Sequence, residues 1–223
     1  MNVQEATTRR LPDLKERHLP ENCRETINTI LKETYGYEQF RNLEIYDDLS
    51  KGKEKLCISQ GQLIENVILE AEKAWKGETQ VDNILLTAPT GSGKSLLFQL
   101  PAIYLGKEYN LLTIVVSPLK ALIVDQVESL QELGYMRVAY ASSDLSPEQK
   151  MEVYRQVREG EIDLFYLSPE LLLSYDIKHF VGERRIGLVV VDEAYGHYVG
   201  QGVPRGLLVL GALPDCFETD SRL

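Results

Sequence analysis

Residues 88–95 are Ala-Pro-Thr-Gly-Ser-Gly-Lys-Ser, and this stretch decides the fold. It follows the apolar run Ile84-Leu85-Leu86 and leads into Leu96-Leu97-Phe98, so we expect a strand, a small-residue turn and a helix in that order. Small residues let successive backbone N–H groups curl around a phosphate, and the helix N-terminus adds partial positive charge. The sequence therefore predicts a phosphate-binding loop.

The side chains of this loop suit a nucleotide bound with Mg²⁺. Lys94 can reach the β- and γ-phosphates, and the hydroxyl of Ser95 can hold the metal. The strict pattern has glycine in the first place, where this chain has Ala88. The alternative is a glycine-rich turn before an ordinary helix, which the Gly-Lys-Ser ending disfavours. The expected nucleotide-binding residues of the loop are Thr90, Gly91, Ser92, Gly93, Lys94 and Ser95.

Composition bounds the class of protein. The 223 residues carry a formal net charge of −10, and 43% are hydrophobic. This length suffices for one large α/β domain with an N-terminal extension, and the negative charge argues against a general basic surface for nucleic acid. The three cysteines lack metal-ligand spacing, which indicates reduced thiols. Without an apolar run typical of a signal peptide or a membrane span, a cytoplasmic protein is expected.

Strands and helices are predicted to alternate after the loop. This pattern indicates an α/β fold with a mostly parallel, doubly wound sheet, in which ligands bind beyond the carboxyl ends of the strands. The predicted strands are 81–87, 111–117, 136–140, 162–167 and 186–191, the last of the sheet. The predicted helices are 21–34, 62–75, 119–133 and one from a capping box at Ser146 and Gln149 to Gly160.

The strand 186–191 delivers two adjacent carboxylates, Asp192 and Glu193, to the carboxyl edge of the sheet. Acidic strand ends are common, but in one sheet with a phosphate loop this pair favours hydrolysis of a Mg²⁺-bound nucleotide. Asp192 would hold the metal, and Glu193 would orient and deprotonate the attacking water. The predicted catalytic residues are therefore Glu193 and Lys94.

Further motifs accompany the loop and the acidic pair. They are Ile30 to Arg41 with its aromatic residues, Gln99-Leu100-Pro101-Ala102, Ser117 to Leu122 followed by Asp125-Gln126-Val127, and Tyr166 to Glu170. With these motifs the chain resembles the first RecA-like, P-loop NTPase motor domain of superfamily 2 helicases, and within them the RecQ family. The resemblance extends from about Ile30 to Ala194.

The resemblance implies an ATP-dependent DNA helicase that uses ATP and Mg²⁺ and binds single-stranded or partly duplex DNA. It implies that Tyr37, Phe40 and Arg41 line the adenine. Residues 42–60 are interpreted as an insertion, so Gln62 is expected to recognise adenine, with Gln60 as the competitor. Without the resemblance, the two aromatics would be predicted as core residues. The DNA contacts that it implies are Ser117, Pro118, Lys120, Gln126, Ser168, Pro169 and Glu170.

The family pattern breaks after Ala194. Tyr195 stands where the family has histidine, and the Trp-Gly and Phe-Arg pairs of the following loop are absent. A shift of reading frame just after Ala194 would restore both pairs with permissible codons, and the genomic DNA tests this hypothesis. We expect an N-terminal extension over 1–60, a RecA-like domain over 61–194, and an aberrant tail over 195–223 that packs poorly.

In the family a second motor domain supplies an arginine that stabilises charge during phosphoryl transfer. These 223 residues alone are therefore expected to bind nucleotide weakly, to hydrolyse it slowly and not to unwind DNA. Two alternatives remain open. One is an interaction module that binds nucleotide without turning it over, and the other is a translocase that moves along nucleic acid without separating strands.

Overall fold

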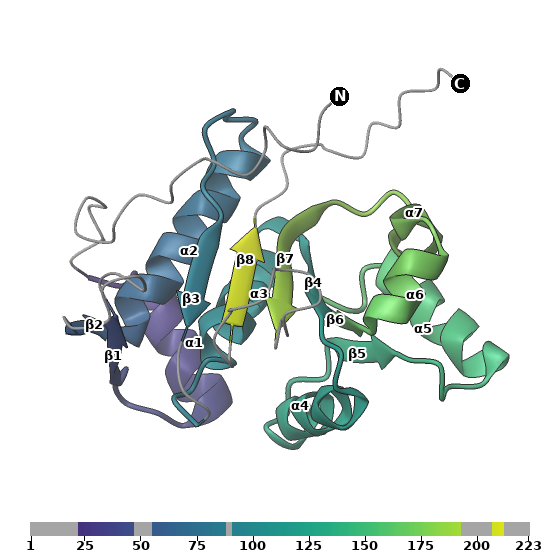
Figure 1. The fold of residues 1–223 in the computed structure, drawn as a ribbon, viewed down its shortest axis with the longest axis horizontal. Coiled ribbons are helices and arrows are strands. Elements are labelled where there is room, and N and C mark those ends of the chain that lie inside the picture. The colour runs from purple at the N-terminus through teal and green to yellow at the C-terminus, as the bar shows by residue number, and fades with distance from the viewer. Residues whose placement is uncertain (1–21, 47–54, 88–90, 193–206, 212–223) are drawn as a thin grey trace.

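The central sheet has six strands in the order β3-β8-β7-β4-β6-β5 (Figure 1). The computed structural model describes residues 22–46, 55–87, 91–192 and 207–211. Strands β7, β4, β6 and β5 run parallel, which confirms the predicted α/β fold with a mostly parallel sheet. The strands are β3 (Ile84–Thr87), β4 (Leu112–Val116), β5 (Val138–Ala141), β6 (Leu164–Leu167), β7 (Ile186–Asp192) and β8 (Leu207–Gly211).

Strand β8 corrects the prediction that the sheet ends with the strand at 186–191 and that everything after 194 packs poorly. It lies between β3 and β7 and pairs antiparallel with both. Its residues, Leu-Leu-Val-Leu-Gly, form a short apolar run, and such a run cannot be assigned to strand or helix from its periodicity alone. Residues 207–211 form a strand because β3 and β7 offer backbone hydrogen-bonding groups on both sides of them. Pairing with both strands satisfies the backbone groups on both sides of β8.

Helices cover both faces of the sheet. Alternate residues of β4 separate the two faces: Val115 belongs to one hydrophobic cluster, whereas Leu112, Ile114 and Val116 belong to the other. The first cluster contains residues of α1 (Glu25–Tyr35), α2 (Gln60–Trp75), α3 (Leu96–Tyr109) and α4 (Lys120–Glu132). The second contains residues of α5 (Pro147–Arg158), α6 (Pro169–Ser174) and α7 (Ile177–Val181), which lie at the right of Figure 1. This confirms the doubly wound arrangement.

The N-terminal part adds a hairpin, β1 (Asn42–Tyr46) with β2 (Lys55–Ser59), within the segment interpreted as an insertion. Residues 1–21 and residues 47–54, which follow β1 in the sequence, lie outside the described residues. Helix α2 begins at Gln60, two residues before the predicted start, because Ser59 is the N-cap and forms a capping box with Gln62. The predicted capping box of Ser146 and Gln149 is confirmed at the start of α5.

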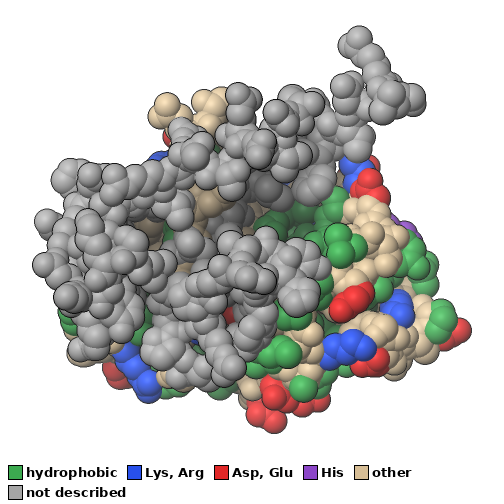
Figure 2. All heavy atoms as spheres, in the orientation of Figure 1, with side chains coloured by type: hydrophobic (Ala, Val, Ile, Leu, Met, Phe, Trp, Pro, Cys, Tyr) green, Lys and Arg blue, Asp and Glu red, His purple; other side chains and the backbone are tan. Residues whose placement is uncertain are grey.

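The other expected element boundaries hold to within about four residues, the largest difference being the start of α1 at Glu25 instead of residue 21. Cys23 and Cys57 are free thiols, as the sequence indicates, and Cys216 lies outside the described residues. No helix in the described part of the chain is long and apolar enough to cross a bilayer. Figure 2 shows acidic, basic and hydrophobic side chains interspersed over the α4 to α7 side of the visible face.

Candidate nucleotide-binding site

The second half of the predicted phosphate loop is described, and its backbone has the expected form. Gly91 and Gly93 have φ of +80° and +82°, a left-handed conformation that residues with a Cβ rarely adopt. Lys94 and Ser95 then lead into α3, whose first turn closes with a hydrogen bond from Leu97 N to Lys94 O at 2.9 Å. The loop thus ends at a helix N-terminus, where orphan N–H groups favour an anion. Thr90 lies outside the described residues.

The side chain of Gln60 forms hydrogen bonds with this loop and with the backbone of Arg41. Its Nε2 donates to the carbonyl oxygen of Gly93 at 3.3 Å, and its Oε1 accepts from the backbone N–H of Arg41 at 3.1 Å. The backbone N–H of Gln60 in turn donates to the carbonyl oxygen of Arg41 at 2.9 Å. With 2% of its surface exposed, Gln60 joins the phosphate loop to the aromatic motif. These contacts indicate that Gln60 stabilises the conformation of the loop.

Replacing Gly93 with alanine is expected to strain this loop and weaken nucleotide binding. A Cβ at Gly93 would lie 2.6 Å from the Nε2 of Gln60, and a left-handed φ costs an alanine about 1–2 kcal/mol. The matched control is Gly77→Ala, because Gly77 has φ of +79° and no heavy atom within 4 Å of the added Cβ. Thermal unfolding should show that both variants are less stable than the wild type. Titration with a fluorescent ATP analogue should show a loss of affinity in Gly93→Ala alone. Equal affinities would contradict the contact.

At the carboxyl edge of the sheet, Asp192 lies near the end of the strand that leads to the loop. Leu208 of β8 pairs with Leu86 of β3 on one side and with Asp192 of β7 on the other. Because β3 and β7 are both antiparallel to β8, they run parallel to each other and end at the same edge. Two strand spacings place the backbone of Asp192 roughly 10 Å from that of Leu86. A nucleotide with its metal can span such a separation, and Glu193 lies outside the described residues.

Ser95 is held by a side chain of another helix. The Nε2 of Gln126, on α4, donates to the Oγ of Ser95 at 2.8 Å. Gln126 also accepts from Gln99 and from the hydroxyl of Tyr166, on β6. Burial raises the pKa of the Tyr166 hydroxyl, and the nearby charge of Asp192 acts in the same direction, so Tyr166 remains a protonated donor. This cluster places Gln126 on the side of the nucleotide loop.

The predicted adenine residues lie around the turn that follows α1. Tyr37 is 50% exposed, and the guanidinium of Arg41 lies 6.0 Å from the centre of its ring. Phe40 packs against the core beside Gly61. The side chain of Gln62 accepts from the backbone N–H of Ser59 at 3.2 Å as part of the capping box. An exposed aromatic ring and a nearby cation form a surface on which a base could stack.

The predicted DNA contacts at Ser117 and Ser168 follow two adjacent strands. Val116 of β4 pairs with Leu167 of β6 and with Val191 of β7, so both serines lie at the same edge as Asp192. Their Oγ atoms are buried, and that of Ser117 has no hydrogen-bond partner among the described atoms. A buried hydroxyl without a partner is costly, which is consistent with a site that a ligand completes.

The other predicted DNA contacts lie near these serines. Pro169 and Glu170 form the first turn of α6, directly after Ser168. Pro118 separates Ser117 from the start of α4, where Lys120 forms an ion pair with Asp144 at 2.9 Å. The positive charge of Lys120 is therefore partly neutralised in this structure.

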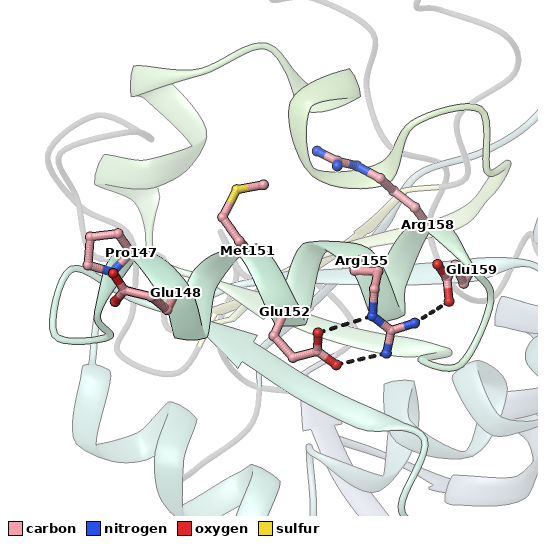
Figure 3. Close-up of a pocket in the computed structure, with 7 residues that line it drawn as sticks. All are labelled: Pro147, Glu148, Met151, Glu152, Arg155, Arg158 and Glu159. Atoms are coloured by element: carbon pink, nitrogen blue, oxygen red, sulfur yellow. Dashed lines mark hydrogen bonds and ion pairs between the residues drawn. The ribbon is translucent and has the colours of Figure 1, made fainter.

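A separate cavity of about 740 Å³ lies along α5 (Figure 3). Arg155 forms ion pairs there with Glu152 and Glu159. None of the predicted site residues lines it, so it offers no support for a nucleotide site. Among the described residues, moreover, no group of three or more His, Cys, Asp or Glu side chains could hold a metal by itself.

Sequence reasoning missed Tyr35, Gln99 and Tyr166 as polar partners at the site. Gln99 lies four residues after Ser95, so helical spacing places both on one face of α3, which was a usable signal. For Tyr35 and Tyr166 only the general preference of buried hydroxyls for partners was available, and it does not say which partner is met.

Comparison with known proteins adds an independent finding. A family model described as DEAD/DEAH box helicase matches residues 62–202. An ATP-dependent DNA helicase RecQ from Synechocystis sp. is 32% identical over 77% of this chain and 30% of its own length. A RecQ from Bacillus subtilis is 31% identical over 75% of this chain and 23% of its own length. ATP-dependent DNA helicase Q-like 5 of Arabidopsis thaliana is 33% identical over 77% of this chain and 15% of its own length.

Proposed function

The chain belongs to the DEAD/DEAH box helicase family, and we propose that it binds ATP with Mg²⁺ as the first motor domain of a RecQ-like DNA helicase. One observation carries the proposal. The strand before the phosphate loop and the strand that ends in Asp192 run parallel, with one strand between them, and end at one edge. Motor activity requires these two motifs to reach the same nucleotide.

The residues present fit a nucleotide. The Oγ of Ser92 is buried without a hydrogen-bond partner among the described atoms, which suits a phosphate oxygen. Lys94 is 9% exposed at the start of α3, where a phosphate would add to the contacts it already makes. A low surrounding dielectric strengthens the attraction between its ammonium group and a phosphate.

Each group has a distinct role in the proposed mechanism. Lys94 binds the terminal phosphates, while Ser95 and Asp192 would hold the metal. Mg²⁺ when bound supplies positive charge to the phosphates as the bond to the leaving group breaks. Glu193 accepts a proton from the water that attacks the terminal phosphate. Tyr37 and Arg41 would stack on adenine, with Gln62 as the proposed reader of its polar edge and Gln60 as a support of the loop.

The DNA would lie across the carboxyl edge of β4 and β6. Phosphate contacts from Ser117, Ser168 and the helix that begins at Pro169 would hold its backbone without reading its bases. The chain spans less than a third of the length of the RecQ relatives described above, so unwinding is proposed only for a protein that joins this domain to a second motor domain.

Replacing Lys94 with alanine is expected to weaken binding of a fluorescent ATP analogue at least tenfold, because a charge-assisted hydrogen bond contributes about 1.5–3 kcal/mol. The control is Lys107→Ala, since Lys107 is exposed in the last turn of the same helix. Titrations of both variants in Mg²⁺ buffer make the comparison. Wild-type affinity in Lys94→Ala would refute the phosphate role.

Measurements of ATP hydrolysis distinguish the helicase motor from the interaction module and the translocase. ATP hydrolysis by the chain should be slow, and it should rise when a second motor domain and single-stranded DNA are added. ATP binding that never leads to hydrolysis under those conditions would favour the interaction module. Hydrolysis and movement on nucleic acid without strand separation, measured on a protein with both domains, would favour the translocase.

A further inference from the structure

The side chain of Gln126 lies at the centre of a hydrogen-bonded cluster beside the phosphate loop. Its Nε2 donates to Ser95 Oγ at 2.8 Å. Its Oε1 accepts from Gln99 Nε2 at 2.8 Å and from the Tyr166 hydroxyl at 3.2 Å. Gln126 belongs to α4, Gln99 to α3 and Tyr166 to β6, while Ser95 is the residue before α3. The cluster therefore joins three elements where the loop becomes a helix.

Tyr35 sets the direction of the hydrogen bonds in this cluster. Burial raises the pKa of the Tyr35 hydroxyl, so it stays protonated, and it donates to Gln99 Oε1 at 3.0 Å. The Nε2 of Gln99 must then face Gln126 and Tyr166, to which it donates at 2.8 and 3.2 Å. The oxygen of the Gln126 amide meets these donors, and its N–H groups are left to face Ser95. Flipping the Gln126 amide would bring two donors into contact.

We propose that Gln126 is a positioning residue that holds the Ser95 hydroxyl ready to bind the Mg²⁺ of a bound nucleotide. This inference rests on the proposed nucleotide-binding function and adds a group to it. Hydrogen-bond partners of a metal ligand orient that ligand and tune its affinity for the metal. Gln126 acts on Ser95 alone and makes no contact with the nucleotide itself.

The hydrogen-bonding capacity of a serine hydroxyl fits this role. The oxygen has two lone pairs and one proton. An N–H of Gln126 occupies one lone pair, which leaves the other for a metal and the proton for a phosphate oxygen. A serine without this contact would have several side-chain rotamers to choose from, and binding would have to order it. The contact removes that cost before the nucleotide arrives.

The resemblance to helicases grouped Gln126 with the DNA contacts. In the structure, however, both ends of its amide are engaged within the cluster, and one end reaches the proposed metal ligand. A merely structural role would consist in filling a polar space between α3, α4 and β6. Such a role predicts a loss of stability but no specific change in the dependence of nucleotide binding on Mg²⁺, so the two roles can be separated.

The test is a titration of the full chain with a fluorescent ATP analogue, with Mg²⁺ varied and also in EDTA. Gln126→Met keeps the length of the side chain and removes its hydrogen bonds. We expect it to raise the Mg²⁺ concentration for half-maximal binding about tenfold or more, with affinity in EDTA changed by less than about twofold. The control is Gln131→Met, on the exposed side of the same helix, which should match the wild type.

A second variant, Gln126→Glu, preserves shape and keeps the test valid where the methionine variant does not fold by circular dichroism. Its carboxylate cannot donate to Ser95, so it should also raise the Mg²⁺ requirement. Wild-type Mg²⁺ dependence in a folded variant, or an equal loss of affinity with and without Mg²⁺ in Gln126→Met, would overturn the inference. A wild-type chain that binds no nucleotide in either buffer would overturn the proposed function as well.

Discussion

Replacing Asp163 with asparagine is expected to lower the free energy of unfolding by about 3–5 kcal/mol, the usual cost of breaking a buried ion pair. The side chain of Asp163 is fully buried at the start of β6. Its Oδ1 accepts from Arg184 at 2.9 Å and its Oδ2 from Arg137 at 2.6 Å, while the hydroxyl of Tyr135 donates at 3.1 Å. One carboxylate therefore connects the segments before β5, β6 and β7.

The cost arises mainly at Arg184, whose side chain is 5% exposed. Burial lowers the pKa of its guanidinium, and Asp163 opposes that shift by stabilising the charged form. Asparagine would leave the buried cation without a counter-charge. The backbone of Gly106 packs so closely on Asp163 that a Cβ there would meet its Cγ at 2.3 Å, so little room remains for water to enter.

Urea unfolding of the wild type and Asp163→Asn measures the loss. Asp125→Asn is the control, because Asp125 is exposed on α4, and a surface change of this kind costs less than about 0.5 kcal/mol. The double variant Asp163→Asn with Arg184→Met should lose less than the sum of its single variants, since the removed charges are partners. Strict additivity would show that the pair does not stabilise the fold.

Replacing Arg24 with methionine is expected to cost a similar amount, about 3–5 kcal/mol, because it would leave two nearly buried carboxylates without their partner. The guanidinium of Arg24 lies 2.6 Å from Glu65 and 2.6 Å from Glu72, both on α2. Arg24 is also the N-cap residue of α1 and lies over the ring of Tyr104 on α3. Arg24 thus connects the start of α1, the helix before the aromatic motif, to α2 and α3.

The effect of Arg24 should depend on pH. Burial by itself would raise the pKa of Glu72, but hydrogen bonds from Arg24 and Tyr109 outweigh it and hold the pKa below its ordinary value of 4.5. A lowered folded-state pKa contributes stability above the unfolded pKa, and that contribution is lost as pH falls through the folded value. The difference in free energy of unfolding between wild type and Arg24→Met should therefore be largest near pH 7. It should decrease below about pH 4.

Arg155→Met provides a matched control for Arg24→Met. Arg155 also forms ion pairs with glutamates, but they lie on the surface of α5 (Figure 3). Water and salt screen such pairs, so this variant should lose far less stability and show no comparable narrowing with pH. Equal losses at Arg24 and Arg155 in urea unfolding would show that burial of the carboxylates is unimportant.

Much of the fold could be predicted because its signals are local. The Gly-Lys-Ser turn lies between a strand and a helix, and the capping box of Ser146 is a pattern four residues long. The hairpin β1–β2 was missed because its arms lie in a segment interpreted as an insertion. The insertion of β8 between β3 and β7 could not be foreseen, since the partner of a strand is not written in its own periodicity.

The sequence by itself determined the alternation of strands and helices from β3 to β7 and the chemistry available at the edge of the sheet. Local patterns are enough to predict these elements, because periodicity, capping and turn chemistry depend on residues that are close together in the sequence. The tertiary structure alone decided which polar groups meet: Gln126 with Ser95, Gln60 with Gly93, and Arg24 with Glu65. These contacts join residues far apart in the chain, and they depend on strand register and helix packing, which local patterns do not specify.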